Sequence, residues 1–266
     1  MADFDGSILY LPHGGGPMPL MGDPGHAGLT ACLRTVPELL GQPAAVLLVS
    51  AHWEEPTPTV QASARPSLLF DYGGFPPQTY AYTYPAPGDP DLAERVVRLL
   101  DRSGLHPGRD ERRGFDHGMF VPMMLMYPDA TVPTVQLSLV ASLDPATHLA
   151  IGEALRDLVG HGVAIVGSGL SFHNMAALGS ANEDARERSR RFDDWLVATC
   201  TDPGIDPDER ARRLSGWEDA PEARFSHPRE EHLLPLHVCA GAAGLAAGQA
   251  VYRDELFAKR VSAILW

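Results

Sequence analysis

The sequence predicts an α/β fold with a largely parallel or mixed central sheet. Short apolar runs rich in Val, Ile and Leu recur along the chain, bounded by Gly or Pro, as buried strands are. Segments with helical periodicity and capping residues alternate with them, which is typical of this fold class. The chain has 266 residues, 44% of them hydrophobic, enough for one sizeable core. We therefore expect a single domain over residues 1–266, with two smaller domains as the alternative.

Four apolar runs are the expected strands. Each is short, and none shows the wide polar face of a surface helix. They are Ser7–Leu11, Ala45–Ser50, Thr131–Leu139 and Val163–Gly167.

Capping residues mark the expected helices. Asp89 and Asp144 each precede a proline, the combination of an N-cap with Pro at the first helical position. A third helix is expected over Asn182–Cys200, with charged residues on one face and apolar residues on the other. A Met-rich apolar helix is expected to begin close to His117.

The stretch Ala64–Pro87 is dense in Pro, Gly and Tyr and predicts a long loop. It is either a functional loop or lid, or a surface excursion held by its own aromatic side chains. In the first case Asp71–Pro87 covers or borders a binding pocket. Its tyrosines are the candidate pocket residues: Tyr72, Tyr80, Tyr82 and Tyr84.

Charge and cysteine content restrict the class of protein. A formal net charge of −13 repels phosphate backbones, so nucleic acid is not an expected partner. Cys32, Cys200 and Cys239 form no CxxC pair, which favours a reducing, cytoplasmic setting over a disulfide framework. No apolar run reaches the roughly 18 residues of a membrane span. The N-terminus lacks the basic flank and long apolar core of a signal peptide, so no membrane partner is expected. A homo-oligomer is compatible with the sequence.

Three histidines lie where expected strands end. His13, His52 and His173 each follow a strand within a few residues, and ligands of open α/β sheets bind beyond such carboxyl ends. A single histidine there is more often structural, but three at one edge indicate a metal pocket, because neutral imidazole is the commonest side-chain metal ligand. With no nearby cysteine, iron(II), manganese or zinc suits the site.

Competing motifs are weaker. Gly14-Gly15-Gly16 after His13 is not followed by the Lys-Ser/Thr of a phosphate loop. Gly167-Ser-Gly169 is too short for a dinucleotide fingerprint, and no Gly-x-Ser-x-Gly elbow occurs. His117 is either a helix-capping residue beside core methionines or an imidazole in the pocket wall.

An ordered set of motifs resembles a known family. LPHGGGP, VSAHWE, DHGMFVPMMLMYP, PTVQLSL, GSGLSFHNM and HPREEHLLPL occur in this order from about Leu9 to the C-terminus. Together they resemble the class III extradiol ring-cleavage dioxygenases, in the DOPA 4,5-dioxygenase-like (LigB-type) branch. The resemblance implies a central mixed sheet flanked by helices on both faces.

The resemblance also implies roles for individual residues. His13 and His52 match the first two metal ligands of the family, and His232 the third. His173 matches the active-site histidine beside the metal, and His117 a further pocket histidine. We expect His227 either to support a metal ligand from behind or to bind substrate in the pocket, and we assign no role to His237. Because the wider superfamily uses a carboxylate as third ligand, Glu231 is the alternative to His232; neighbouring helical residues point about 100° apart, so only one faces the metal.

The implied reaction opens the ring of a catechol with O₂ at an iron(II) site, which zinc(II) can also occupy. It needs a base for the catechol and later an acid, roles expected for His173 with His117 assisting. Two other functions stay open: a zinc hydrolase that uses the same histidines to activate water, and a metal-binding relative without catalysis.

Overall fold

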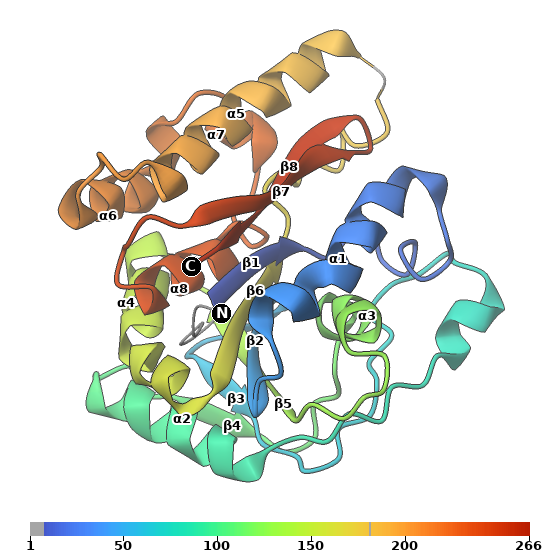
Figure 1. Cartoon of the computed structure of the whole chain (residues 1–266), viewed down its shortest axis with the longest axis vertical. Helices are drawn as coiled ribbons and strands as arrows, with labels where there is room; N and C mark the ends of the chain where they lie inside the picture. Colours follow the sequence, from blue (N-terminus) through green and yellow to red (C-terminus); the bar gives the residue numbers. More distant parts are fainter. Residues whose placement is uncertain (1–7, 181) are drawn as a thin grey trace.

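The computed structural model describes residues 8–180 and 182–266, in which eight strands form one mixed sheet in the order β4-β3-β5-β2-β6-β1-β8-β7 (Figure 1). The strands are β1 (Ile8–Pro12), β2 (Ala45–Glu55), β3 (Thr59–Gln61), β4 (Gly108–Asp110), β5 (Thr134–Val140), β6 (Val163–Gly169), β7 (Gln249–Leu256) and β8 (Lys259–Leu265). The helices are α1 (Ala27–Leu40), α2 (Pro90–Arg102), α3 (His117–Met126), α4 (Pro145–Leu155), α5 (Glu183–Thr201), α6 (Pro207–Ser215), α7 (Ala223–Ser226) and α8 (Leu234–Ala242). Short 3₁₀ segments are η1 (Pro24–His26), η2 (Pro77–Ala81), η3 (Arg156–His161) and η4 (Trp217–Asp219).

The centre of the sheet is parallel and its flanks are antiparallel. Strands β5, β2, β6 and β1 run in one direction. Strand β8 pairs antiparallel with β1, and β3 pairs antiparallel with β5. This arrangement confirms the predicted α/β fold with a mixed sheet.

Helices cover both faces of the sheet, as Figure 1 shows. Helices α2, α4 and α8 pack on one face and share an apolar core with α5 and α6. Helices α1 and α3 cover the other face and form a second core. Strands β5 and β6 between these layers are buried along their whole length, because helices cover both of their faces.

All four expected strands are present, and each extends further toward the C-terminus than its hydrophobic run indicated. Ser7, the first residue of the first expected run, lies outside the described residues. The expected caps are also confirmed. The side chains of Asp89, Asp144 and Asn182 accept hydrogen bonds from the first turns of α2, α4 and α5.

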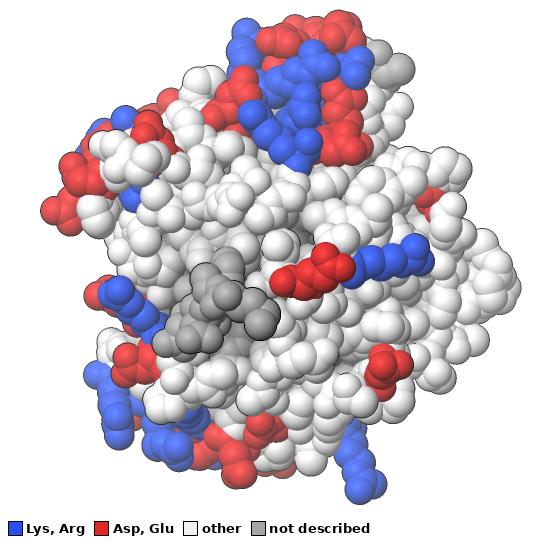
Figure 2. Space-filling view, in the orientation of Figure 1, with Lys and Arg blue, Asp and Glu red and all other residues white. Residues whose placement is uncertain are grey.

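The charged side chains visible in Figure 2 gather mainly on the outer helices, where both signs are interleaved. On α5, Arg186 and Arg190 both pair with Glu255 of β7. This surface of α5 therefore lacks the single-sign basic stripe that binds nucleic acid. Within the described ranges, no helix has the length and apolar character needed to cross a membrane.

Candidate metal centre

The strand register brings the ends of three central strands to one edge of the sheet. Pro12 of β1 pairs with Gly169 of β6, and Ser50 of β2 pairs with Ser168 of β6. His13 is therefore the first residue after β1. His52 lies at an irregularity of β2, where the register with β5 shifts between Val49 and Glu54.

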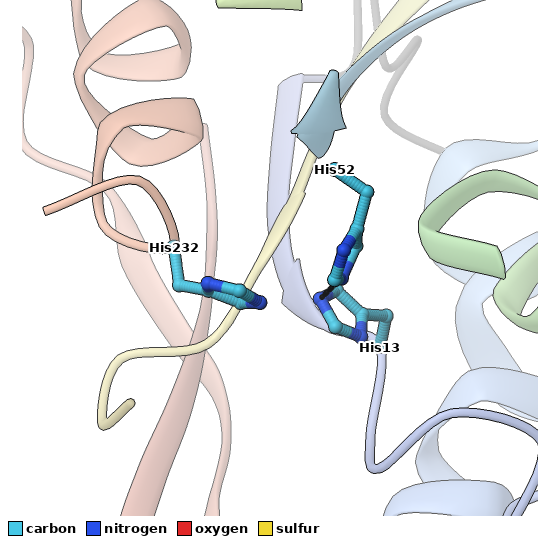
Figure 3. Close-up of side chains that lie close together, drawn as sticks. All are labelled: His13, His52 and His232. Carbon is cyan, nitrogen blue, oxygen red and sulfur yellow. Dashed lines mark hydrogen bonds between the residues drawn. The ribbon is translucent and has the colours of Figure 1, made fainter. Parts of the chain in front are cut away.

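Three imidazoles converge at this edge. His13, His52 and His232 each offer one ring nitrogen, and these three atoms lie within 4.8 Å of one another. The Nε2 atoms of His13 and His52 are 3.2 Å apart. Figure 3 shows the rings pointing toward a common centre, from the segment after β1, from β2 and from the segment before α8. The arrangement could hold a metal ion.

Each of these rings has an oxygen partner on its outer nitrogen, Nδ1. His13 Nδ1 donates to the carbonyl of its neighbour Gly14 at 3.0 Å. His232 Nδ1 donates to Glu231 Oε1 at 3.0 Å, and His52 Nδ1 lies 3.7 Å from Asp71 Oδ2. Partners of this kind keep the proton on Nδ1 and direct the Nε2 lone pairs inward. A cation at the centre would be coordinated by all three Nε2 lone pairs, so the donor set fits a divalent metal.

Burial keeps these imidazoles neutral, the form that binds metal. Burial, with smaller contributions from the neighbouring histidines, holds the pKa of His13 and of His232 well below the ordinary value. Burial and the nearby His117 lower the pKa of His52 to about 3.

Glu231 lies behind His232 and does not belong to the converging trio. Its Oε1 is 3.0 Å from Nδ1 of both His232 and His173, and its Oε2 is 3.4 Å from Arg229. Burial raises the pKa of Glu231, but the hydrogen bond to His173 and nearby cations outweigh it, so the net pKa is lowered. Glu231 therefore acts as an ionised acceptor, which leaves His232 as the third candidate ligand.

His117 and His173 flank the trio on opposite sides. The His117 ring lies 3.9 Å from that of His52, measured between centroids, and donates from Nδ1 to Asp71 Oδ1 at 2.8 Å. The His173 ring stacks on that of His232, with centroids 3.4 Å apart. Asp71 and Glu231 thus each contact one ring of the trio and one flanking histidine, which orients both.

A buried polar network holds the β2 segment that carries His52. Asp116, the N-cap of α3, accepts from Ser50 Oγ at 2.7 Å and from Arg113 Nη2 at 3.0 Å. Arg113 also donates to the backbone carbonyl of His52, and Ser50 Oγ accepts from the His52 amide. Full burial raises the pKa of Asp116, and these donors offset part of that effect. Local sequence patterns did not indicate this network, although Asp116 stands three residues after Arg113 at a helix start.

Gly169 at the end of β6 lets the backbone of His232 approach the sheet. The His232 carbonyl accepts from the Leu170 amide at 3.1 Å and from the Tyr10 hydroxyl at 3.0 Å. A Cβ atom on Gly169 would lie only 2.1 Å from that carbonyl oxygen. The position of His232 therefore depends on the absence of a side chain at residue 169.

Gly169→Ala is expected to lower the free energy of unfolding by about 1–3 kcal/mol, because two backbones must separate to admit the methyl group. It should also weaken metal binding by displacing His232. Gly160→Ala is the matched control, since a Cβ there meets no atom within 4 Å. Denaturant unfolding and metal titration of both variants check this; equal behaviour of the two would contradict it.

A cavity of about 400 Å³ opens beside the trio, within the size range of small-molecule sites. We call it the central cavity. Its walls comprise His13, His52, His117, His173 and His232, Gly14, Gly15, Gly16 and Gly179, and the larger side chains of Met18, Tyr72, Phe75, Leu170, Met175, Leu178 and Phe257.

The long loop contributes only its first part to this cavity. Tyr72 and Phe75 line it, so Asp71–Pro87 borders the pocket as predicted. Tyr80, Tyr82 and Tyr84 do not line it. Tyr84 is buried elsewhere and donates to the Tyr127 carbonyl at 2.9 Å. The two interpretations of the loop therefore each describe one part of it.

His227 occupies a different position from the one expected. It is fully buried, donates from Nε2 to the Ser171 carbonyl at 3.0 Å, and packs against Phe192 and Trp217. It does not line the central cavity, because the end of α7 turns its ring into the core. We therefore withdraw the substrate-binding assignment for His227. His237 is likewise buried, with Nε2 donating to the Leu214 carbonyl.

Comparisons with known proteins identify the family of this chain. The family described as the catalytic LigB subunit of aromatic ring-opening dioxygenase matches residues 7–263. The dioxygenase tasH of Hapsidospora irregularis is 39% identical, over 97% of this chain and 85% of that protein. A 4,5-DOPA dioxygenase extradiol of Beta vulgaris is 38% identical, over 76% of this chain and 74% of that protein.

A solved structure shows the same fold. The crystal structure of an uncharacterized protein from Escherichia coli K12 superposes with a TM-score of 0.77 at 28% identity and covers 98% of this chain and 99% of that one. The family match spans nearly the whole chain, including all five histidines of the cavity. The chain therefore belongs to the LigB family and is an extradiol ring-cleavage dioxygenase of that family.

Proposed function

We propose that the protein uses iron(II), bound by His13, His52 and His232, to open the aromatic ring of a catechol with O₂. The observation that carries the proposal is the convergence of three neutral imidazoles in the wall of the central cavity. Three nitrogen ligands on one side leave positions for substrates on the other, as in non-haem iron(II) oxygenases. Bound iron(II) would hold the catechol and O₂ side by side and pass charge between them.

The flanking histidines carry the proton transfers in this proposal. His173 and His117 each have Nδ1 on a carboxylate, so each presents Nε2 as the exchanging atom. His173 Nε2 takes the proton of a catechol hydroxyl and later returns one to an oxygen atom of the opening ring. His117 assists on the opposite side of the trio. The product is of the muconic semialdehyde type.

Oxygen uptake with a catechol panel tests the function. We expect protein loaded anaerobically with iron(II) to consume one O₂ per catechol and to form a yellow product. The metal-free protein is the control, and zinc(II) is expected to occupy the site without supporting turnover. Anaerobic ester or amide hydrolysis by the zinc form, without oxygen uptake by the iron form, would instead establish the hydrolase. Metal binding with neither activity would establish a non-catalytic relative.

A reducing, cytoplasmic setting is part of the proposal. Cys32, Cys200 and Cys239 are all free thiols, and the last two are buried. Iron(II) is also retained more readily where oxidants are scarce. Cell fractionation checks the setting, and sedimentation of the purified protein decides between a monomer and a homo-oligomer.

A further inference from the structure

The lining of the central cavity is of two chemical kinds. It comprises five imidazoles and, apart from four glycines, apolar or aromatic side chains, which we call the apolar side. Seven residues form the apolar side: Met18, Tyr72, Phe75, Leu170, Met175, Leu178 and Phe257. Among the residues that the structure describes, no Lys, Arg, Asp or Glu lines the cavity.

The Tyr72 hydroxyl and two candidate cations, Lys259 and Arg229, already have partners. The Tyr72 hydroxyl donates to the Thr79 carbonyl at 2.6 Å, so it does not offer its proton to a ligand. Lys259, the single lysine of the sequence, is fully buried and does not line the cavity; its ammonium donates to the Ser180 carbonyl at 2.8 Å. Arg229 pairs with both carboxylate oxygens of Glu54 at 2.6 Å. The apolar side therefore presents no cation to an anionic ligand.

The hairpin between β7 and β8 places Phe257 in this wall at a conformational cost. Phe257 and Ala258 both have left-handed backbone conformations, with φ of 53° and 57°. Two-residue hairpin turns of this kind usually contain Asn and Gly, because other side chains are disfavoured there. Strained residues that persist often serve a site.

Packing around Phe257 explains how this conformation is retained. A Cβ atom on Gly15 would lie 2.7 Å from the Phe257 ring, so the glycine loop after His13 fits directly against it. The ring also packs edge-to-face on His26, with centroids 4.9 Å apart. Phe257 is thus held in place as part of the cavity wall.

We infer that the substrate is a catechol whose ring substituent is uncharged and apolar, an inference that rests on the proposed function. Phe257 is a specificity-determining residue for this substituent. The two ring hydroxyls face the histidines, and the substituent lies on the apolar side. A carboxylate or ammonium there would lose water without gaining a partner. An alkyl group gains about 0.8 kcal/mol per buried CH₂ from the same wall, which is about fourfold in kcat/KM.

A substrate series tests the inference on the iron-loaded enzyme. From catechol through 4-methylcatechol and 4-ethylcatechol to 4-propylcatechol, we expect kcat/KM to rise about fourfold per methylene. The methyl ester of 3,4-dihydroxyphenylacetate should exceed the free acid at least about tenfold, and L-DOPA should be as poor as the acid. A free acid or L-DOPA that equals or exceeds the ester overturns the inference. Absence of oxygen uptake with every compound, parent catechol included, instead overturns the proposed function.

Two sets of variants test whether the apolar side of the cavity causes the preference for uncharged substituents. Phe257→Ala should remove most of the gain along the alkyl series, whereas an unchanged slope would overturn the role of Phe257. Met175 is 71% exposed, so it can be replaced without disturbing the core. Met175→Lys supplies a cation and should reduce the ester-to-acid ratio about tenfold relative to Met175→Gln, the uncharged control. Equal ratios in these two variants would show that the substituent does not approach this wall.

Discussion

Replacement of His13 by alanine is expected to abolish metal binding and ring cleavage together. The variant retains two imidazoles of the trio, and two ligands hold iron(II) poorly. The nearest ring outside the trio, that of His117, lies 5.3 Å from the His13 ring between centroids, and its Nδ1 bond to Asp71 holds it there. We therefore expect less than about a tenth of the wild-type metal content, together with loss of oxygen uptake on any catechol. Metal analysis of the purified protein beside turnover measures both.

Two controls make this result specific. His161→Ala removes an exposed histidine at the end of η3 and should leave metal content and turnover unchanged. His13→Ala should remain folded, because the His13 side chain belongs to neither apolar core, and circular dichroism checks this. Full metal content in His13→Ala would contradict the trio as the metal site, and full metal content with lost turnover would place His13 among the residues that act on the substrate.

The convergence of histidines was predictable from local patterns. Apolar runs identify buried strands, and the carboxyl ends of parallel strands meet at one edge, so His13 and His52 could be placed together before any coordinates. His232 is different. Its approach to the sheet depends on Gly169, some sixty residues earlier, and only the family resemblance indicated it.

Contacts between distant segments could not be predicted in this way. The bond from Asp71 to His117 joins residues 46 apart, one in an irregular loop and one at a helix start. His227 stands five residues before His232, yet α7 turns it into the core. Proximity in sequence to a ligand therefore did not place it in the cavity.

The β7–β8 hairpin was missed for a related reason. Its outer strand, Gln249–Leu256, carries four charged or amide side chains and faces solvent along part of its length, so it lacks a clear apolar run. Its turn contains Phe257 and Ala258 where local rules predict Asn and Gly. Tertiary packing against Gly15 and His26 overrides the local preference, and the residue that breaks the rule is the one that lines the cavity.

His173→Ala is expected to keep most of the metal but lose about 10² to 10⁴ in turnover rate. The physical reason is its place in the site. The His173 ring stacks on His232 and lines the cavity, but it is not one of the three rings whose nitrogens converge. Loss of a positioned acid or base removes an interaction made in the transition state, which lowers kcat by this range. Metal content measured beside kcat separates this variant from His13→Ala.

Glu231→Gln provides the matched comparison for His173. The amide keeps the shape of the side chain but no longer offers a charged acceptor to the Nδ1 atoms of His173 and His232. We expect a smaller loss of turnover than in His173→Ala, together with weaker metal binding through His232. If His173→Ala emptied the site as fully as His13→Ala, His173 would be a ligand and the proton transfers would pass to His117. If His173→Ala remained fully active, neither role would hold, and the assignment of His173 from the SFHN motif would be withdrawn.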